Sequence, residues 1–154
     1  MAVPLETEVD NILSSAVNKT LLAYFETMNT QYILKDGETW DKYLPSELQS
    51  ERFQINRYSD GQEYKWHFDQ GFNYLNKDGT FTRVFSIVIY LNDDFEGGET
   101  EFQFTKVKPE KGACLIFPSH FMYNHCARPV TNGTKYACAS WLKPLIEEKE
   151  KEDV

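Results

Sequence analysis

The chain has no run of apolar residues long enough to cross a bilayer, and its N-terminus lacks the basic start and apolar segment of a secretory signal. It is also short of basic residues, because 16 Lys and Arg stand against 24 Asp and Glu, for a net charge of −8. An acidic protein repels phosphate backbones unless its basic residues cluster. We therefore expect a soluble, cytoplasmic protein with neither a membrane nor a nucleic acid as its partner.

Cysteine is scarce as well, since Cys114, Cys126 and Cys138 are the only three. An odd number cannot all form disulfides, and each lies in an apolar or mixed strand-like run where a free thiol packs as a small hydrophobic group. Their even spacing fits no zinc pattern. We expect reduced, structural thiols.

What the chain does contain is enough apolar material for one folded domain over residues 1–154, with 41% hydrophobic and 15% aromatic residues. A charged stretch closes the chain at residues 147–154. Near the start, apolar side chains at helical spacing predict an amphipathic helix over residues 7–26. The apolar positions are Val9, Ile12, Leu13, Ala16, Val17 and Leu21.

Beyond residue 50 the pattern changes to short apolar or alternating runs, which predict strands. Turn residues such as Asp-Gly, Glu-Gly-Gly and Thr-Asn-Gly separate these runs. Many short strands after one helix favour a sandwich or a barrel. The predicted strands cover residues 52–58, 64–69, 83–91, 99–105, 113–117, 122–127 and 135–142.

The residues with the clearest chemistry are His67 and Asp69. In a strand they share a face, so an imidazole and a carboxylate can hold neighbouring positions of a divalent metal. An isolated pair of this kind is more often a surface His beside an Asp, but His125 in a later predicted strand offers a third ligand. His120 is the rival third ligand, and its place after Pro118-Ser119 favours a loop histidine instead.

Two histidines and one carboxylate leave positions open on iron for an oxygenase reaction, although a zinc hydrolase would accept the same ligands. The chain has no His-Glu-x-x-His helix to support the hydrolase. Lys135 lies ten residues after His125 in a predicted strand. A buried ammonium is costly unless an anion pairs with it, whereas a lysine at a strand edge points to water. Trp141 shares the face of Lys135 if that strand is regular.

Several spaced motifs support the oxygenase interpretation. Residues 57–69 read Arg-Tyr-x-x-Gly-Gln-x-Tyr-x-x-His-x-Asp, and Tyr-Leu-Asn, Gly-Gly-x-Thr and Pro-x-x-Gly follow at 90–92, 97–100 and 109–112. This order resembles the iron(II)- and 2-oxoglutarate-dependent dioxygenases, most closely their prolyl 4-hydroxylase group, over residues 52–142. The resemblance implies a mainly β fold with an N-terminal helix, whose core is a double-stranded β-helix, or jelly-roll.

The same resemblance implies the roles of individual residues. Iron(II) would be held by His67, Asp69 and His125, which form the catalytic centre. 2-Oxoglutarate would chelate the iron and place its far carboxylate on Lys135. The pocket for this cosubstrate would be completed by Tyr58, Tyr90, Thr100 and Trp141.

The reaction implied is conversion of 2-oxoglutarate and O₂ to succinate and CO₂, coupled to hydroxylation of a substrate C–H bond, with ascorbate as an optional further cofactor. A proline in a peptide or protein is the expected substrate, bound near Arg83 and Tyr64. Residues 70–82 form either a lid or a packed loop. The alternative is an enzyme that hydroxylates a free amino acid or a non-prolyl residue. A non-catalytic jelly-roll binding module is a third hypothesis, which an intact ligand set argues against.

Overall fold

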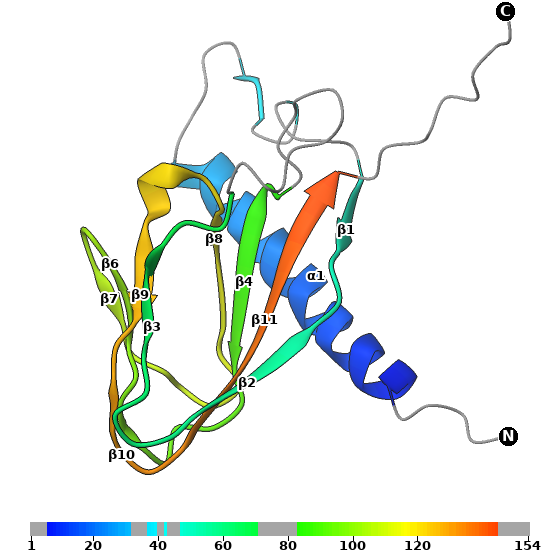
Figure 1. The fold of residues 1–154 in the computed structure, drawn as a ribbon. Helices are drawn as coiled ribbons and strands as arrows, with labels where there is room; N and C mark the ends of the chain where they lie inside the picture. The colour runs from blue at the N-terminus through cyan, green and yellow to red at the C-terminus, as the bar shows by residue number, and fades with distance from the viewer. Residues whose placement is uncertain (1–5, 32–36, 40–41, 43–46, 71–82, 145–154) are drawn as a thin grey trace, which may run out of the picture.

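The computed structural model describes residues 6–31, 37–39, 42, 47–70 and 83–144, which form one long helix and antiparallel sheets (Figure 1). Helix α1 spans Glu6–Gln31 and confirms the predicted helix. It continues five residues beyond residue 26, because no Gly or Pro interrupts the segment. The exposed hydroxyls of Thr27 and Thr30 bond back to the carbonyls of Ala23 and Thr27 within this last part.

The larger sheet has the order β1-β11-β4-β8, and β2 also pairs with β11. Its strands are β1 Leu48–Ser50, β2 Gln54–Tyr58, β4 Phe85–Tyr90, β8 Cys114–Pro118 and β11 Lys135–Pro144. β11 is the centre of this sheet, since β4 pairs along one edge and β1 and β2 share the other. Helix α1 crosses behind the sheet (Figure 1).

The smaller sheet has the order β3-β9-β6-β7 and lies across from the larger one (Figure 1). Its strands are β3 Tyr64–His67, β6 Thr100–Phe102, β7 Lys106–Val107 and β9 His125–Ala127. A separate ladder joins β5 Glu96–Gly97 to β10 Val130–Asn132. Two facing antiparallel sheets with one covering helix confirm the predicted jelly-roll core.

Most predicted strands are present but shorter than expected, and one was partly wrong. Residues 122–123 of the predicted strand 122–127 belong instead to the 3-10 helix η4, Phe121–Tyr123. The His120 side chain caps this short helix by accepting a hydrogen bond from the Met122 amide. Such a cap favours a helical turn over a strand at this position. The strand therefore starts only at His125. The short strands β1, β5, β7 and β10 were not predicted, since such brief pairings are decided by their partners.

The main core lies between α1 and the larger sheet. Leu13 and Val17 of α1 pack with apolar residues from β4 and β11, which are Phe85, Ile87, Ile89, Cys138 and Leu142. Side chains alternate along a strand, so the intervening residues of β4 and β11 point to the opposite side, between the two sheets. One face of these strands thus builds the core, and the other is left for a cavity.

The structure also bears on the cysteines and on the absence of a membrane-spanning helix. All three cysteines are free, as predicted, and burial raises the pKa of Cys138 to about 11. No helix in the described part of the chain is both long and apolar enough to cross a membrane. The predicted loop 70–82, apart from Gln70, and the charged stretch 147–154 lie outside the described residues.

Two glycines with positive φ provide a test of the fold. Gly97 (φ 76°) and Gly112 (φ 84°) both adopt a backbone that disfavours side chains. A Cβ on Gly97 would collide with the Pro129 carbonyl oxygen, whereas a Cβ on Gly112 meets nothing within 4 Å. We expect Gly112→Ala to lower the free energy of unfolding by about 1–2 kcal/mol. Gly97→Ala should cost about 1–3 kcal/mol more. Urea denaturation of both variants measures the difference, and equal losses would contradict it.

Candidate active site

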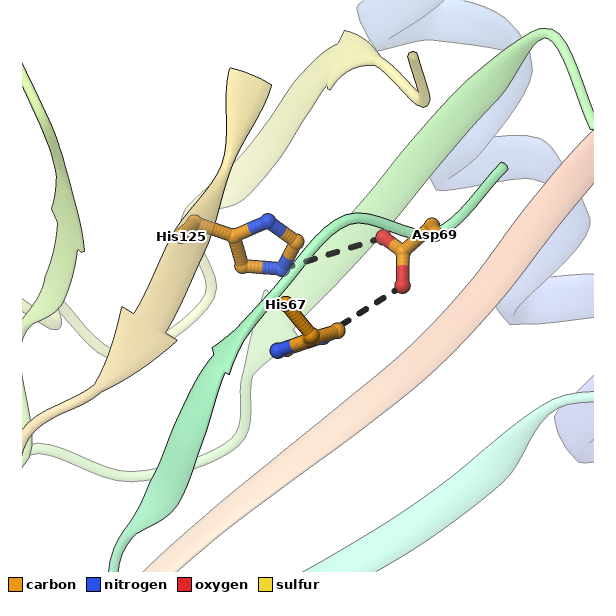
Figure 2. Close-up of side chains that lie close together, drawn as sticks. All are labelled: His67, Asp69 and His125. Carbon is orange, nitrogen blue, oxygen red and sulfur yellow. Dashed lines mark ion pairs between the residues drawn. The ribbon is translucent and has the colours of Figure 1, made fainter. Parts of the chain in front are cut away.

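Three side chains that the sequence singled out come together between the sheets. His67 ends β3 and His125 begins β9, and the two are direct partners in the antiparallel ladder. The His67 Nε2 lies 3.4 Å from the Asp69 Oδ1, and the His125 Nε2 lies 3.7 Å from the Asp69 Oδ2 (Figure 2). The ligand atoms of all three lie within 4.8 Å of one another. The rival, His120, is not part of this cluster.

The local structure of β3 differs from the regular strand expected. Its pairing with β9 shifts register between Tyr64, opposite Ala127, and His67, opposite His125. Three steps on β3 match two on β9, which is a bulge. The bulge allows Tyr64 and His67 to line one cavity, with their rings 4.5 Å apart edge to face. Asp69 lies beyond the end of β3, so strand alternation does not fix its direction.

Backbone carbonyls orient both imidazoles. The Nδ1 of His67 lies 2.8 Å from the Lys65 carbonyl, and the Nδ1 of His125 lies 3.0 Å from the Tyr123 carbonyl. A carbonyl only accepts, so each Nδ1 carries the hydrogen and donates it. The lone pair of each neutral ring is therefore on Nε2, the atom that faces Asp69. This tautomer is the one that can bind a metal at the cluster.

Burial and neighbouring charges shift the pKa values of His67, Asp69 and His125 in different directions. Burial lowers the pKa of His125, and the attraction of Asp69 only partly opposes this. Burial would also lower the pKa of His67, but the hydrogen bond to Asp69 and the Lys65 carbonyl outweigh it and raise the pKa. Burial would raise the pKa of Asp69, whereas hydrogen bonds from His67 and Ser86 hold it below its usual range. The cluster thus contains an ionised carboxylate at neutral pH.

A cavity of about 410 Å³ adjoins the cluster. Alternate residues of β11 line one wall of it, which confirms that Lys135 and Trp141 share a face. These wall residues are Lys135, Ala137, Ala139 and Trp141. Tyr58, Tyr64, Arg83 and Thr100 also contribute to the lining.

Lys135 is buried at this cavity, with 2% of its surface exposed. Its Nζ donates a 2.6 Å hydrogen bond to the Gly98 carbonyl and lies 5.4 Å from the ring centres of Tyr58 and Tyr90. Burial lowers the Lys135 pKa to about 8, although the charge of Glu99 acts in the other direction. Among the described residues no carboxylate lies within 4 Å of this ammonium. It is therefore a buried cation that an anionic ligand could neutralise.

Tyr90, whose ring centre is 5.4 Å from the Lys135 Nζ, shares a buried hydroxyl pair with Thr100. The Tyr90 hydroxyl and the Thr100 Oγ1 are 2.8 Å apart and both buried. Burial raises the pKa of Tyr90 to about 12 and also raises the pKa of Tyr58, so both phenols keep their protons at neutral pH. Gly98 makes the arrangement possible, because a Cβ there would lie 3.1 Å from the Lys135 Cδ. The Gly-Gly-x-Thr motif thus supplies the carbonyl that accepts from Lys135 and a threonine that lines the cavity.

Arg83 lines the cavity but is only 6% exposed. Its guanidinium forms a two-point ion pair with Glu51, with hydrogen bonds of 2.9 and 2.8 Å. It also lies 3.7 Å from the ring centre of Trp141. The side chain therefore supports the cavity wall as well as reaching the cavity, and its substrate role stays a prediction.

Two residues near the cluster were missed from the sequence. Ser86 Oγ donates a 2.5 Å hydrogen bond to the Asp69 Oδ2, and Ser119 Oγ lies 2.9 Å from Ser86 Oγ. The sequence did carry a signal for Ser86. It is a lone polar residue within the run Phe85–Tyr90, where every other side chain is apolar or aromatic. A polar residue in such a run needs a buried partner.

The donor set fits a metal that prefers mixed nitrogen and oxygen ligands. Two imidazoles, each with its Nε2 towards Asp69, and one ionised carboxylate converge, and the adjoining cavity has room for further ligands. This combination is the facial triad of non-haem iron(II) oxygenases. The jelly-roll fold and the cluster together define that class of protein.

The chain belongs to the 2OG-Fe(II) oxygenase superfamily, whose family model matches residues 53–143. It is 32% identical over 102 residues to a PKHD-type hydroxylase of Synechococcus sp. (strain CC9902), covering 62% of this chain and 43% of the relative. It is also 32% identical over 123 residues to a probable prolyl 4-hydroxylase of Arabidopsis thaliana, covering 64% of this chain and 43% of the relative. The chain thus spans less than half the length of either relative.

A solved structure shows the same fold. The viral collagen prolyl hydroxylase from Paramecium Bursaria Chlorella virus-1, in its 2OG complex, aligns with a TM-score of 0.60 and 25% identity. The alignment covers 84% of this chain and 72% of that protein. The family uses iron(II), 2-oxoglutarate and O₂, and the cluster of His67, Asp69 and His125 fits the metal.

A metal-binding measurement tests the ligand assignment. We expect His125→Ala to lose Mn(II) binding, measured anaerobically by the electron paramagnetic resonance signal of free Mn(II), because a facial site has no spare ligand. His67→Ala and Asp69→Ala should behave in the same way. His120→Ala is the control and should bind Mn(II) as the wild type does, since His120 caps η4 outside the cluster. Loss of binding in His120→Ala with normal binding in His125→Ala would reverse the assignment.

Proposed function

We propose that this protein is a 2-oxoglutarate- and O₂-dependent hydroxylase that acts on a proline in a peptide or protein. The observation that carries the proposal is the buried Lys135 ammonium, which faces a cavity shared with the cluster of His67, Asp69 and His125. A dicarboxylate could bind the metal at one end and neutralise Lys135 at the other. A binding module without catalysis would need neither a metal cluster nor a buried cation in the same cavity.

We assign a role to each residue within this proposal. His67, Asp69 and His125 hold iron(II), and Lys135 pairs with the far carboxylate of 2-oxoglutarate. Hydroxyl groups of Tyr58, Tyr90 and Thr100 assist Lys135, while Trp141 forms part of the wall. When bound, iron(II) and 2-oxoglutarate supply the oxidising chemistry, in which one atom of O₂ enters succinate as CO₂ leaves and the other enters the substrate hydroxyl.

The substrate proposal has support from both the relatives and the cavity. One relative is named a probable prolyl 4-hydroxylase and the viral structure is a collagen prolyl hydroxylase. At the cavity, Gln54 and Asn56 of β2 present amide side chains, which can hydrogen-bond a peptide backbone. Tyr64 is 53% exposed beside His67 and offers an aromatic surface to a proline ring. These groups support the proposal of a peptide substrate.

The role of Lys135 can be tested by removing its charge. We expect Lys135→Ala to raise the 2-oxoglutarate concentration needed for half-maximal turnover by more than about 100-fold, because losing one partner of a buried charge pair costs about 3–5 kcal/mol. Mn(II) affinity should change little, since Lys135 does not belong to the metal cluster. An unchanged 2-oxoglutarate requirement would refute the role.

The pH dependence of the same interaction gives a second readout. The Lys135 pKa is about 8 without a ligand, and a bound carboxylate would raise it. Binding then takes up a proton above pH 8, so 2-oxoglutarate affinity should fall as pH rises from 8 towards 10 and stay flat below about 7. Lys135→Arg is the matched control, because an arginine keeps its charge throughout this range. An equal fall in wild type and Lys135→Arg would assign the effect to another group.

The substrate assignment is tested by product analysis. We expect mass spectrometry to find one added oxygen on proline when the enzyme acts on proline-containing peptides. Arg83→Ala should slow peptide hydroxylation more than the uncoupled decay of 2-oxoglutarate, because the metal ligands are unchanged. Glu51→Gln is the control, since it weakens the ion pair but keeps the guanidinium. Oxygen found only on free amino acids would favour the alternative enzyme, and normal peptide kinetics in Arg83→Ala would remove Arg83 from the substrate site.

A further inference from the structure

The three proposed metal ligands are not positioned by the same forces. His67 and His125 are partners in the β3–β9 ladder, so backbone pairing sets the distance between them. Asp69 lies two residues beyond the end of β3 and belongs to no strand. A carboxylate in such a segment needs other contacts to hold one direction.

A chain of two buried hydroxyls supplies these contacts. The Ser86 hydroxyl donates to the Asp69 Oδ2 at 2.5 Å, which uses its single hydrogen because an ionised carboxylate only accepts. The 2.9 Å bond between Ser86 and Ser119 must then have Ser119 as its donor. Both serines are 1% exposed, so no bulk water competes for these bonds. A hydrogen bond to a charged acceptor in such a setting is among the stronger ones.

The backbone after Asp69 is tied to the same place. The Gln70 amide donates to the Ser119 carbonyl at 2.9 Å, and the Gln70 side chain donates to the Arg83 carbonyl at 2.9 Å. The Ser119 amide in turn donates to the Val84 carbonyl at 3.0 Å. Residues at the ends of β4 and β8 therefore fix both the carboxylate and the peptide that follows it.

We propose that Ser86 and Ser119 are positioning residues for the metal centre, acting as a hydroxyl relay that aims the Asp69 carboxylate at the ion. The inference rests on the proposed metal site. A carboxylate has about four lone-pair positions, so Ser86 can occupy one and leave others for the metal. Residues that orient a metal ligand in this way typically change metal affinity by about 10- to 100-fold when they are removed.

The sharpest test compares Ser86→Thr with Ser86→Val, which have the same shape and differ by one hydroxyl. Mn(II) alone is the probe, titrated anaerobically without 2-oxoglutarate, and thermal unfolding in EDTA is measured in parallel. We expect Ser86→Thr to keep an affinity close to wild type and Ser86→Val to bind about 10- to 100-fold more weakly. Ser119→Ala should weaken binding by a smaller factor, and adding it to Ser86→Val should have little further effect, because the relay is already broken.

Ser140→Ala is the control for loss of a buried hydroxyl. Ser140 is fully buried but its hydroxyl donates to the Glu51 carbonyl, so Mn(II) affinity should be unchanged. Equal Mn(II) affinity in Ser86→Val and Ser86→Thr would overturn the relay while leaving the metal site intact. A wild-type protein that binds no Mn(II) would instead overturn the metal site and the relay together. If Ser86→Val does not fold, the Ser119→Ala affinity decides, and a wild-type value would refute the relay.

Discussion

The alternation of side chains along β11 is the constraint on which the rest of the structure depends. Cys138 and Leu142 point to α1 and join the core, while Lys135, Ala137 and Trp141 point into the cavity. Neighbouring strands hold β11 on both edges, so its register cannot shift without exchanging these two faces. The stability of the core and the placement of the buried ammonium therefore come from the same hydrogen-bonded ladders.

This arrangement explains how an acidic protein can present a positive charge to an anion. The chain has a net charge of −8, and among the described residues every acidic side chain whose burial is known, apart from Asp69, is exposed or half-buried. Lys135, in contrast, is 2% exposed. Electrostatic interactions are stronger where water is excluded. The attraction of one buried ammonium for an anion can therefore exceed the repulsion from distant, solvated negative charges. A carboxylate bound at Lys135 would offset the cost of burying the cation, so the site would favour a dicarboxylate over a neutral ligand.

Much of the fold and of the candidate site could be predicted from the sequence, because the signals for them are local. The spacing of His67, Asp69 and His125, and the position of Lys135, indicated a metal site and an anion site in one barrel. Strand alternation predicted that Trp141 shares a face with Lys135. The bulge in β3, the 3-10 helix before His125 and the Arg83–Glu51 pair were not predicted. The 3-10 helix depends on the His120 side chain that caps it. The bulge and the ion pair depend on contacts between distant segments, and 32 residues separate Arg83 from Glu51. No periodicity or turn signal records a contact of that kind.

The buried residues of the site and its exposed residues have different consequences for function. His125 and Lys135 are buried and held by strand pairing, and in the proposed function they bind the metal and the cosubstrate. Gln54 and Tyr64 line the same cavity but are exposed, so a change of either side chain removes less buried packing. Proteins that share this fold can therefore keep one oxidative reaction while they bind different substrates. Ser86 belongs with the interior group, because its hydroxyl lies between the core strand β4 and the carboxylate of Asp69.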